Sequence, residues 1–333
     1  MVIRNNRTTC CPRRPLISSC ALLLLLVSSG ADAGQSGRQR HKQQAAEGPA
    51  TAAVDERMLA TQVMLDRAGY SPGEIDALAG TSTERALDAF TKDGGKADAL
   101  PADAVTQYTI TEQDVAGPFT ASIPNDMMEM AKLPALGYTS ALEMLGERFH
   151  TSPTLLKRMN PSARFAAGES INVPNVASAV APVGAPPGRQ SDPGNPAITT
   201  VTVRKSTSDL ILTDNTGKTL MYAPVTTGSE HDPLPIGEWK VTGVQHDPKF
   251  HYNPALFWDA EPGHSKETIP AGPNNPVGVV WIDITRPHYG LHGTPEPSKI
   301  GKTESHGCVR LTNWDALKLA SLVRPGTRVV FAE

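Results

Sequence analysis

The chain has 333 residues, which is long enough for two or three domains. It carries 31 Lys and Arg against 34 Asp and Glu, and its formal net charge of −3 at pH 7 argues against a nucleic-acid partner. The composition is that of a globular protein, apart from 29 prolines that point to loops and linkers.

Residues 1–33 have the order of features that is typical of a secretory signal peptide. Four arginines precede an apolar run from Leu16 to Val27, and Ala31-Asp32-Ala33 offers a cleavage site of small residues. A membrane anchor needs about 20 apolar residues, and this run is shorter. We therefore expect an exported protein of the periplasm or cell wall, with no membrane span after cleavage.

Cleavage changes both the charge and the cysteine content. Lys and Arg fall to 27 and Asp and Glu to 33, so the net charge becomes −6. Cys10, Cys11 and Cys20 leave with the leader, and Cys308 is then the single cysteine. Paired cysteines of exported proteins form disulfides, so a lone cysteine is either a free, reactive thiol or a buried, inert side chain.

Residues 34–53 are rich in Gln, Arg and Ala without hydrophobic periodicity, so we expect a flexible tail. Residues 54–106 show helical spacing and predict a small module of three short helices. Within it, residues 68–76, 80–83 and 86–90 resemble the three-helix peptidoglycan-binding-like domain of cell-wall enzymes, which implies contact with glycan strands. The expected helix limits are Asp55 and Gly69, then Ser82 or Thr83 and Gly94, then a start after Pro101.

Residues 107–176 predict a second small module with the order strand, helix, helix, strand. Its Asn160-Pro161 and closing Val173-Pro174-Asn175 resemble a LysM glycan-binding module, in which residues 111–136 would be an insertion. A helical spacer without a ligand is the alternative. Residues 177–196 are rich in Ala, Pro and Gly and are expected to form an interdomain linker. The positions that predict the module's elements are Tyr108-Thr109-Ile110, Leu145 with Phe149, Leu155 with Met159, and Ile171-Asn172-Val173.

Residues 197–333 change to the period of two that is typical of strands. We expect a mainly β catalytic domain, a sandwich or partly closed barrel with one helix, following the three-helix and α+β modules. The expected strands are 200–203, 210–212, 220–225, 237–244, 277–284 and 328–331, and the expected helix is 314–322 with Thr312 or Asn313 as its N-cap.

Residues 245–275 interrupt these strands with five prolines and several aromatic residues. A long loop inside a compact domain usually works as a lid or a binding wall. We therefore expect this segment to cover a substrate, with Tyr252 and Trp258 as contact residues; a passive excursion of the chain is the alternative.

The stretch Ser305-His306-Gly307-Cys308 gives the lone thiol a chemical context. A cysteine nucleophile needs a base, because a thiol is only a few per cent ionised at pH 7. His306 is two residues from Cys308 and His292 is 16 residues before it, so spacing alone leaves both as candidates. Gly307 removes a side chain where a substrate carbonyl must approach, and the N–H groups of Gly307 and Cys308 are natural donors to an oxyanion.

His292-Gly293-Thr294 followed by residues 305–311 resembles the signature of YkuD-type L,D-transpeptidases, and the resemblance extends over about residues 198–333. It implies that Cys308 is the nucleophile and that His292 is its base, oriented by the Gly293 carbonyl. It implies that Ser305, His306 and Gly307 shape the site and its oxyanion hole. The candidate substrate-binding residues are Arg310, Tyr289, Trp258 and Tyr252.

Arg310 has two interpretations, since a guanidinium suits a substrate carboxylate but also a structural salt bridge. The resemblance implies acyl transfer that releases D-alanine from tetrapeptide stems of peptidoglycan and forms 3–3 cross-links. Water, a free D-amino acid or a wall-anchored lipoprotein are alternative acceptors, and no metal or organic cofactor is implied. The rival classes are a zinc hydrolase that uses both histidines and the thiol as ligands, a papain-like cysteine hydrolase, and a non-catalytic wall-binding protein.

Overall fold

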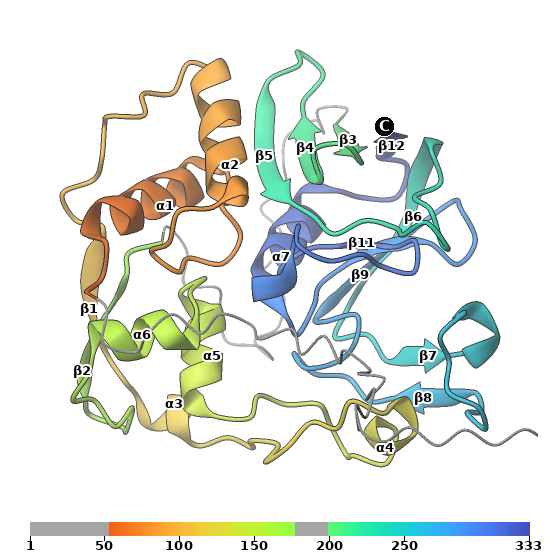
Figure 1. Cartoon of the computed structure of the whole chain (residues 1–333), viewed down its shortest axis with the longest axis horizontal. Helices are drawn as coiled ribbons and strands as arrows, with labels where there is room; N and C mark the ends of the chain where they lie inside the picture. The colour runs from red at the N-terminus through yellow and green to blue at the C-terminus, as the bar shows by residue number, and fades with distance from the viewer. Residues whose placement is uncertain (1–52, 177–198) are drawn as a thin grey trace, which may run out of the picture. The chain divides into compact units, whose positions relative to one another are not determined.

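The computed structural model describes residues 53–176 and 199–333 (Figure 1), and all of them belong to one compact unit, Gly48–Glu333. The predicted signal peptide, the predicted linker and all but the last residue of the predicted tail lie outside the described residues. None of the helices in these two described ranges is long and apolar enough to cross a membrane.

The first predicted module begins with two helices, α1 (Glu56–Ala68) and α2 (Thr81–Lys92). The Asp55 side chain caps α1 by accepting a hydrogen bond from the Met58 N–H, and Gly69 ends the helix in the left-handed conformation with φ of +86°. The prediction of a third helix after Pro101 is wrong. Residues 101–104 form turns, and the chain continues into strand β1 (Val105–Thr109), whose backbone groups pair with another strand instead.

The second predicted module has the expected order of strand, helix, helix, strand. Strands β1 and β2 (Ser170–Pro174) pair antiparallel and enclose helices α5 (Ala141–Arg148) and α6 (Pro153–Met159). The segment between β1 and α5 carries two single-turn helices, α3 (Glu112–Val115) and α4 (Met127–Met130). The two predicted modules share one apolar cluster, which includes Leu59, Val63, Leu145, Leu155 and Val173.

The C-terminal part is built on an eight-stranded sheet within the described residues, in the order β11-β10-β9-β6-β12-β3-β4-β5. The pairs β12–β3 and β10–β11 are parallel and the other pairs are antiparallel. This mainly β architecture agrees with the expected one. The strands are β3 (Thr200–Arg204), β4 (Asp209–Thr213), β5 (Thr219–Pro224), β6 (Gly237–His246), β9 (Val280–Ile284), β10 (Gly290–His292), β11 (Val309–Arg310) and β12 (Arg328–Ala332).

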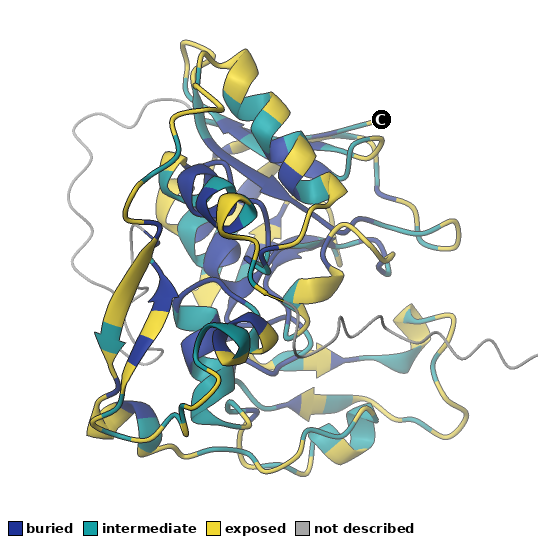
Figure 2. Cartoon of the chain, turned by 60° about the vertical axis from the view of Figure 1, so that its left-hand side comes forward, coloured by how far each residue is buried: buried dark blue, intermediate teal, exposed yellow. Residues whose placement is uncertain are grey.

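Helix α7 (Asn313–Leu322) packs against β9 and β10, and the Thr312 side chain caps it by accepting a hydrogen bond from the Asp315 N–H. Apolar residues of the sheet and of this helix form the main core, which includes Val203, Leu291 and Leu319. Buried residues gather at the centre between sheet and helices, whereas the outer helix faces are exposed (Figure 2). A short 3₁₀ turn, η2 (Pro297–Lys299), follows β10.

The proline-rich segment 245–275 contains elements that the sequence pattern did not predict. Strands β7 (Phe250–Tyr252) and β8 (Glu267–Ile269) form an antiparallel hairpin, with a 3₁₀ turn, η1 (Pro254–Leu256), between them. Helix α4 packs against β8, and the two lie side by side in Figure 1. Prolines cannot donate a ladder hydrogen bond, so the many prolines of this segment argued against strands. The hairpin was also missed because each of its strands has only three residues.

Candidate active site

The site lies where β10 and β11 run side by side. Leu291 pairs with Val309, and His292 pairs with Arg310, in parallel register. Leu291 and Val309 are fully buried in the main core. Because side chains alternate along a strand, His292 and Arg310 project from the opposite face, and Cys308 precedes Val309 on that same face.

The Cys308 thiol is free and partly exposed. Its Sγ lies 3.8 Å from the carbonyl oxygen of His288, at the end of the turn that leads into β10. Desolvation raises the pKa of the Cys308 thiol, while a hydrogen bond from the Gly290 N–H and the charge of Arg310 oppose that rise. The resting thiol is therefore protonated at neutral pH and needs a base.

His292 has the properties of such a base. Its ring is 4% exposed, stacks on Trp281 with centroids 5.4 Å apart, and directs Nδ1 at the Gly293 carbonyl oxygen at 2.7 Å. A carbonyl only accepts hydrogen bonds, so Nδ1 carries the proton and Nε2 keeps its lone pair. Burial, followed by the charge of Arg310, lowers the pKa of His292 to about 3, although the Gly293 bond opposes this. The imidazole is neutral at pH 7.

Gly293 can only be a glycine at this point. A Cβ there would lie 2.2 Å from Oδ1 of Asn313, the first residue of α7. The Gly293 N–H donates to the Val280 carbonyl of β9 at 3.2 Å, which helps to hold the residue whose carbonyl orients His292. Sequence reasoning found Gly293 but named Asn313 only as a possible N-cap of the helix, although that residue follows the cysteine motif by only two positions.

The loop before β11 is held by Ser305 and Gly307. The Ser305 hydroxyl donates to the Cys308 carbonyl at 2.6 Å, and its N–H donates to the Thr227 carbonyl at 2.9 Å. Gly307 has φ of +97°, and a Cβ there would lie 2.5 Å from Cε1 of Tyr289. Both the left-handed backbone and the close approach of the Tyr289 ring therefore require a glycine.

His306 faces the proline-rich segment. Its Nε2 bonds Oδ1 of Asp259 at 2.7 Å, and its ring contacts Phe257 edge-on with centroids 4.9 Å apart. The two histidines that spacing alone could not separate thus have different partners. Asp259 and Phe257 were not predicted, because nothing local links them to a motif almost fifty residues later.

The three predicted aromatic contact residues have different surroundings. Trp258 is 60% exposed and stacks on His231, with centroids 4.3 Å apart. Tyr289 packs against Gly307, which belongs to the loop 305–308 that carries the thiol (the thiol loop). Tyr252 is only 4% exposed, and its hydroxyl bonds His264 Nδ1 at 2.9 Å. The expectation of a substrate contact at Tyr252 is therefore not supported, because its ring is packed inside the proline-rich segment.

Arg310 presents a cation beside the thiol. Its Nε is buried and has no hydrogen-bond partner, and its guanidinium forms no ion pair within residues 53–176 and 199–333. Burial lowers the pKa of this side chain, and the neighbouring Cys308, Glu296 and Asp259 oppose that effect. The structural salt bridge considered for Arg310 is thus not found, and its donors are free to meet an anion.

The arrangement does not form a metal-ligand set. In the described part of the chain, no three His, Cys, Asp or Glu side chains lie close enough together to hold a metal ion. His292 turns its Nδ1 to a backbone carbonyl and His306 turns to the Asp259 carboxylate. A nucleophile–base pair with an adjacent cation is what these contacts support.

Comparison with known proteins identifies the family of this domain. Residues 198–331 match the L,D-transpeptidase catalytic domain family, YkuD. Bacillus subtilis YkuD, described as an L,D-transpeptidase, is 30% identical over 191 residues, which are 56% of this chain and 91% of that protein. Bacillus licheniformis YkuD is 53% identical over 57 residues, which are 17% of this chain and 34% of that protein.

Among solved structures, an L,D-transpeptidase from Mycobacterium smegmatis is 17% identical with a TM-score of 0.34, over 41% of this chain and 59% of that one. The chain therefore spans about a third of the Bacillus licheniformis relative and about three fifths of the mycobacterial structure, but nearly all of Bacillus subtilis YkuD. The chain belongs to the L,D-transpeptidase family.

Proposed function

We propose that this protein is a cysteine-dependent L,D-transpeptidase that acts on peptidoglycan stem peptides. The observation that carries the proposal is the placement of Cys308, the neutral His292 and the unpaired Arg310 on one face of β10 and β11. A thiol, a base that is ready to accept its proton, and a cation beside both are the groups that acyl transfer from a carboxylate-bearing peptide requires.

In the first step, the Cys308 thiol gives its proton to His292 Nε2, and the sulfur attacks the carbonyl carbon of the third stem residue. The N–H groups of Gly307 and Cys308 stabilise the oxyanion, an interaction worth about 2.7–4 kcal/mol per donor in a well-studied hydrolase. The amide bond to the terminal D-alanine then breaks. The D-alanine nitrogen takes the proton from His292, and a thioester remains on Cys308.

In the second step, the side-chain amine of the third residue in another stem attacks the thioester. His292 accepts a proton from that amine, the carbon–sulfur bond breaks, and the product is a 3–3 cross-link with a regenerated thiol. Water at the same position gives an L,D-carboxypeptidase. A free D-amino acid exchanges the terminal residue, and a lysine of a lipoprotein becomes attached to the wall.

We infer that Arg310 binds the terminal carboxylate of the substrate. A charge-assisted hydrogen bond of this kind is stronger than a neutral one, and the buried Nε of Arg310 lacks a partner. The exposed Trp258 and the His306–Asp259 contact place the proline-rich segment beside the thiol loop. We infer that this segment covers the bound stem peptide and that Tyr289 lines the same side of the binding site.

The remaining parts of the proposal concern location and partners. A wall substrate requires an exported protein, which agrees with the leader expected at residues 1–33 and with action in the periplasm or cell wall. The peptidoglycan-binding-like and LysM-like modules would hold glycan strands near the site.

The test is to incubate the protein, starting at Gly34, with sacculi rich in tetrapeptide stems and to analyse the muropeptides by mass spectrometry. We expect release of D-alanine together with 3–3 cross-linked dimers in the wild type and neither product with Cys308→Ala. Tripeptides without dimers would identify water as the acceptor. Unchanged muropeptides with the wild type would refute the proposed function.

A further inference from the structure

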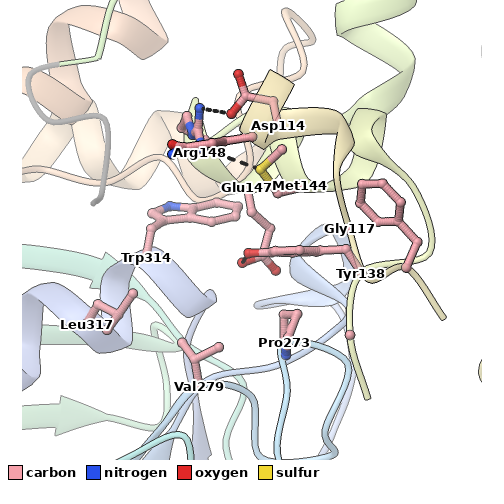
Figure 3. A pocket seen from close by; sticks show the side chains of 13 residues that line it. Asp114, Gly117, Tyr138, Met144, Glu147, Arg148, Pro273, Val279, Trp314 and Leu317 are labelled. Carbon is pink, nitrogen blue, oxygen red and sulfur yellow. Dashed lines mark hydrogen bonds and ion pairs between the residues drawn. The ribbon is translucent and has the colours of Figure 1, made fainter. Parts of the chain in front are cut away.

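The second N-terminal module reaches the catalytic domain through Glu147 of helix α5. This helix contacts α7, and Glu147 lines a cavity of about 260 Å³ between the two domains. Figure 3 shows Trp314 and Tyr138 on opposite sides of this cavity, with Glu147 between them. The Tyr138 hydroxyl is hydrogen-bonded to Oε2 of Glu147 at 3.4 Å, so the other oxygen, Oε1, is left for a second partner.

That second partner is Asn313, the first residue of α7. Its Nδ2 donates to Oε1 of Glu147 at 2.7 Å and to the Pro273 carbonyl at 3.2 Å. Its Oδ1 accepts a hydrogen bond from the Val279 N–H at 3.2 Å. Both ends of the amide are engaged, so the side chain has one orientation, and Glu147 supplies the shortest of the three bonds.

The fixed amide of Asn313 lies directly against the backbone of the catalytic base. Its Oδ1 would lie 2.2 Å from a Cβ placed on Gly293 and 2.1 Å from a Cβ placed on Gly278. The amide therefore leaves no room for a side chain at either position. Gly293 is therefore held by Asn313 at its α-carbon and by the Val280 carbonyl at its N–H. The Gly293 carbonyl, which belongs to the next peptide, accepts the hydrogen bond from His292 Nδ1–H.

We propose that Glu147 is a positioning residue for His292, acting through Asn313 and the Gly293 carbonyl. The N-terminal module thereby stabilises the tautomer of the base that leaves Nε2 free for the Cys308 proton. This role rests on the proposed function, because His292 matters as a base only in that reaction.

Glu147 acts here as a hydrogen-bond acceptor rather than as an anion. Desolvation raises the pKa of Glu147 to about 8, so the carboxyl group is protonated in most molecules at pH 7. A glutamine keeps an acceptor oxygen in the same place and carries no charge. Methionine has a similar length and keeps the packing but cannot accept the bond from Asn313.

The experiment compares Glu147→Met with Glu147→Gln in the full exported chain. A matched control is Glu143→Met, one turn earlier on α5, whose carboxylate bonds Asn274 and Thr139 but not Asn313. We expect Glu147→Met to lower kcat for D-alanine release by about tenfold or more with KM nearly unchanged, since a small misplacement of a reacting group has effects of this size. Glu147→Gln and Glu143→Met should both stay within about twofold of wild type.

A second measurement follows the base itself and needs no substrate. Nitrogen-15 NMR of the His292 ring should show a single Nδ1–H tautomer in the wild type and in Glu147→Gln, and mixed tautomers in Glu147→Met. If wild type releases no D-alanine, the proposed function fails but the NMR comparison still tests the positioning role. Equal kcat and an unchanged tautomer in Glu147→Met would overturn the inference. Glu147→Leu repeats the test if the methionine variant does not fold.

Discussion

The His306 ring is hydrogen-bonded to the Asp259 carboxylate, with 2.7 Å between Nε2 and Oδ1. The histidine nearest to the nucleophile in sequence is therefore engaged with the proline-rich segment. His292, which is 16 residues from Cys308, instead projects from the face of the strand pair that carries the thiol. This division of partners makes the two histidines separable by mutation.

We predict that His292→Ala and Cys308→Ala abolish D-alanine release from tetrapeptide muropeptides, whereas His306→Ala keeps part of the activity. Removing a general base typically costs a factor of about 10²–10⁴, and removing the nucleophile leaves no acyl acceptor. The measurement is the rate of D-alanine release under saturating donor. Complete loss in His306→Ala, with activity retained in His292→Ala, would reverse the assignment of the base.

A second prediction concerns the unpaired guanidinium of Arg310. Hydrogen bonds to charged groups contribute about 1.5–3 kcal/mol, so Arg310→Gln should raise KM for the tetrapeptide donor by about 10- to 100-fold. The exposed Arg324 provides the control, since Arg324→Gln should leave KM unchanged. Amidation of the donor's terminal carboxylate should weaken the wild type but make little further difference to Arg310→Gln. An equal loss in both proteins would show that Arg310 does not bind that carboxylate.

The sequence predicted the long strands of the catalytic domain because alternation over five or more residues is readable. β3, β4, β5, β6, β9 and β12 all lie at predicted positions. The strands that carry His292 and Arg310 of the candidate site, β10 and β11, have only three and two residues, which is too short to show any period. Their residues were found instead through the resemblance of the Cys–His motif to a known family.

Contacts between distant segments were beyond sequence reasoning. The bond between His306 and Asp259 joins residues 47 positions apart, and the bond between Asn313 and Glu147 joins residues 166 positions apart. No local pattern encodes either pairing. The burial of Tyr252 was unpredictable for the same reason, because an aromatic residue in a loop fits a substrate-binding surface and a small internal cluster equally well until its neighbours are known.

A third prediction tests the contact between the proline-rich segment and the thiol loop. Asp259 and His306 are both partly exposed, and an exposed pair contributes at most about 1 kcal/mol. Asp259→Asn should therefore raise KM by no more than about fivefold and leave the rate of Cys308 acylation at saturation close to wild type. Steady-state kinetics and single-turnover thioester formation measure the two effects. A large fall in the single-turnover rate would place Asp259 in the chemical step instead.

The last prediction is a loss of stability between pH 6.5 and 8. Desolvation raises the pKa of Glu147 from 4.5 to about 8 and that of Glu74 from 4.5 to about 7. From pH 6.5 the unfolded chain has already lost both protons, whereas the folded chain releases the Glu74 proton near pH 7 and the Glu147 proton near pH 8. Unfolding therefore becomes easier as the pH rises, by at most about 1.4 kcal/mol per pH unit for each group. The depressed pKa of His292 acts oppositely, but only below its unfolded value of 6.5.

Urea unfolding at half-unit pH steps measures this slope. Glu147→Gln removes the titrating proton while keeping the acceptor for Asn313, so its free energy of unfolding should fall less steeply above pH 6.5 than that of the wild type. Glu304→Gln is the control, because Glu304 is exposed and should leave the slope unchanged. Parallel slopes for wild type and Glu147→Gln would mean that Glu147 is already ionised in the folded protein. A neutral glutamine would then be a poor substitute for a charged acceptor, and the predicted near-wild-type kcat of Glu147→Gln would fail in the same protein.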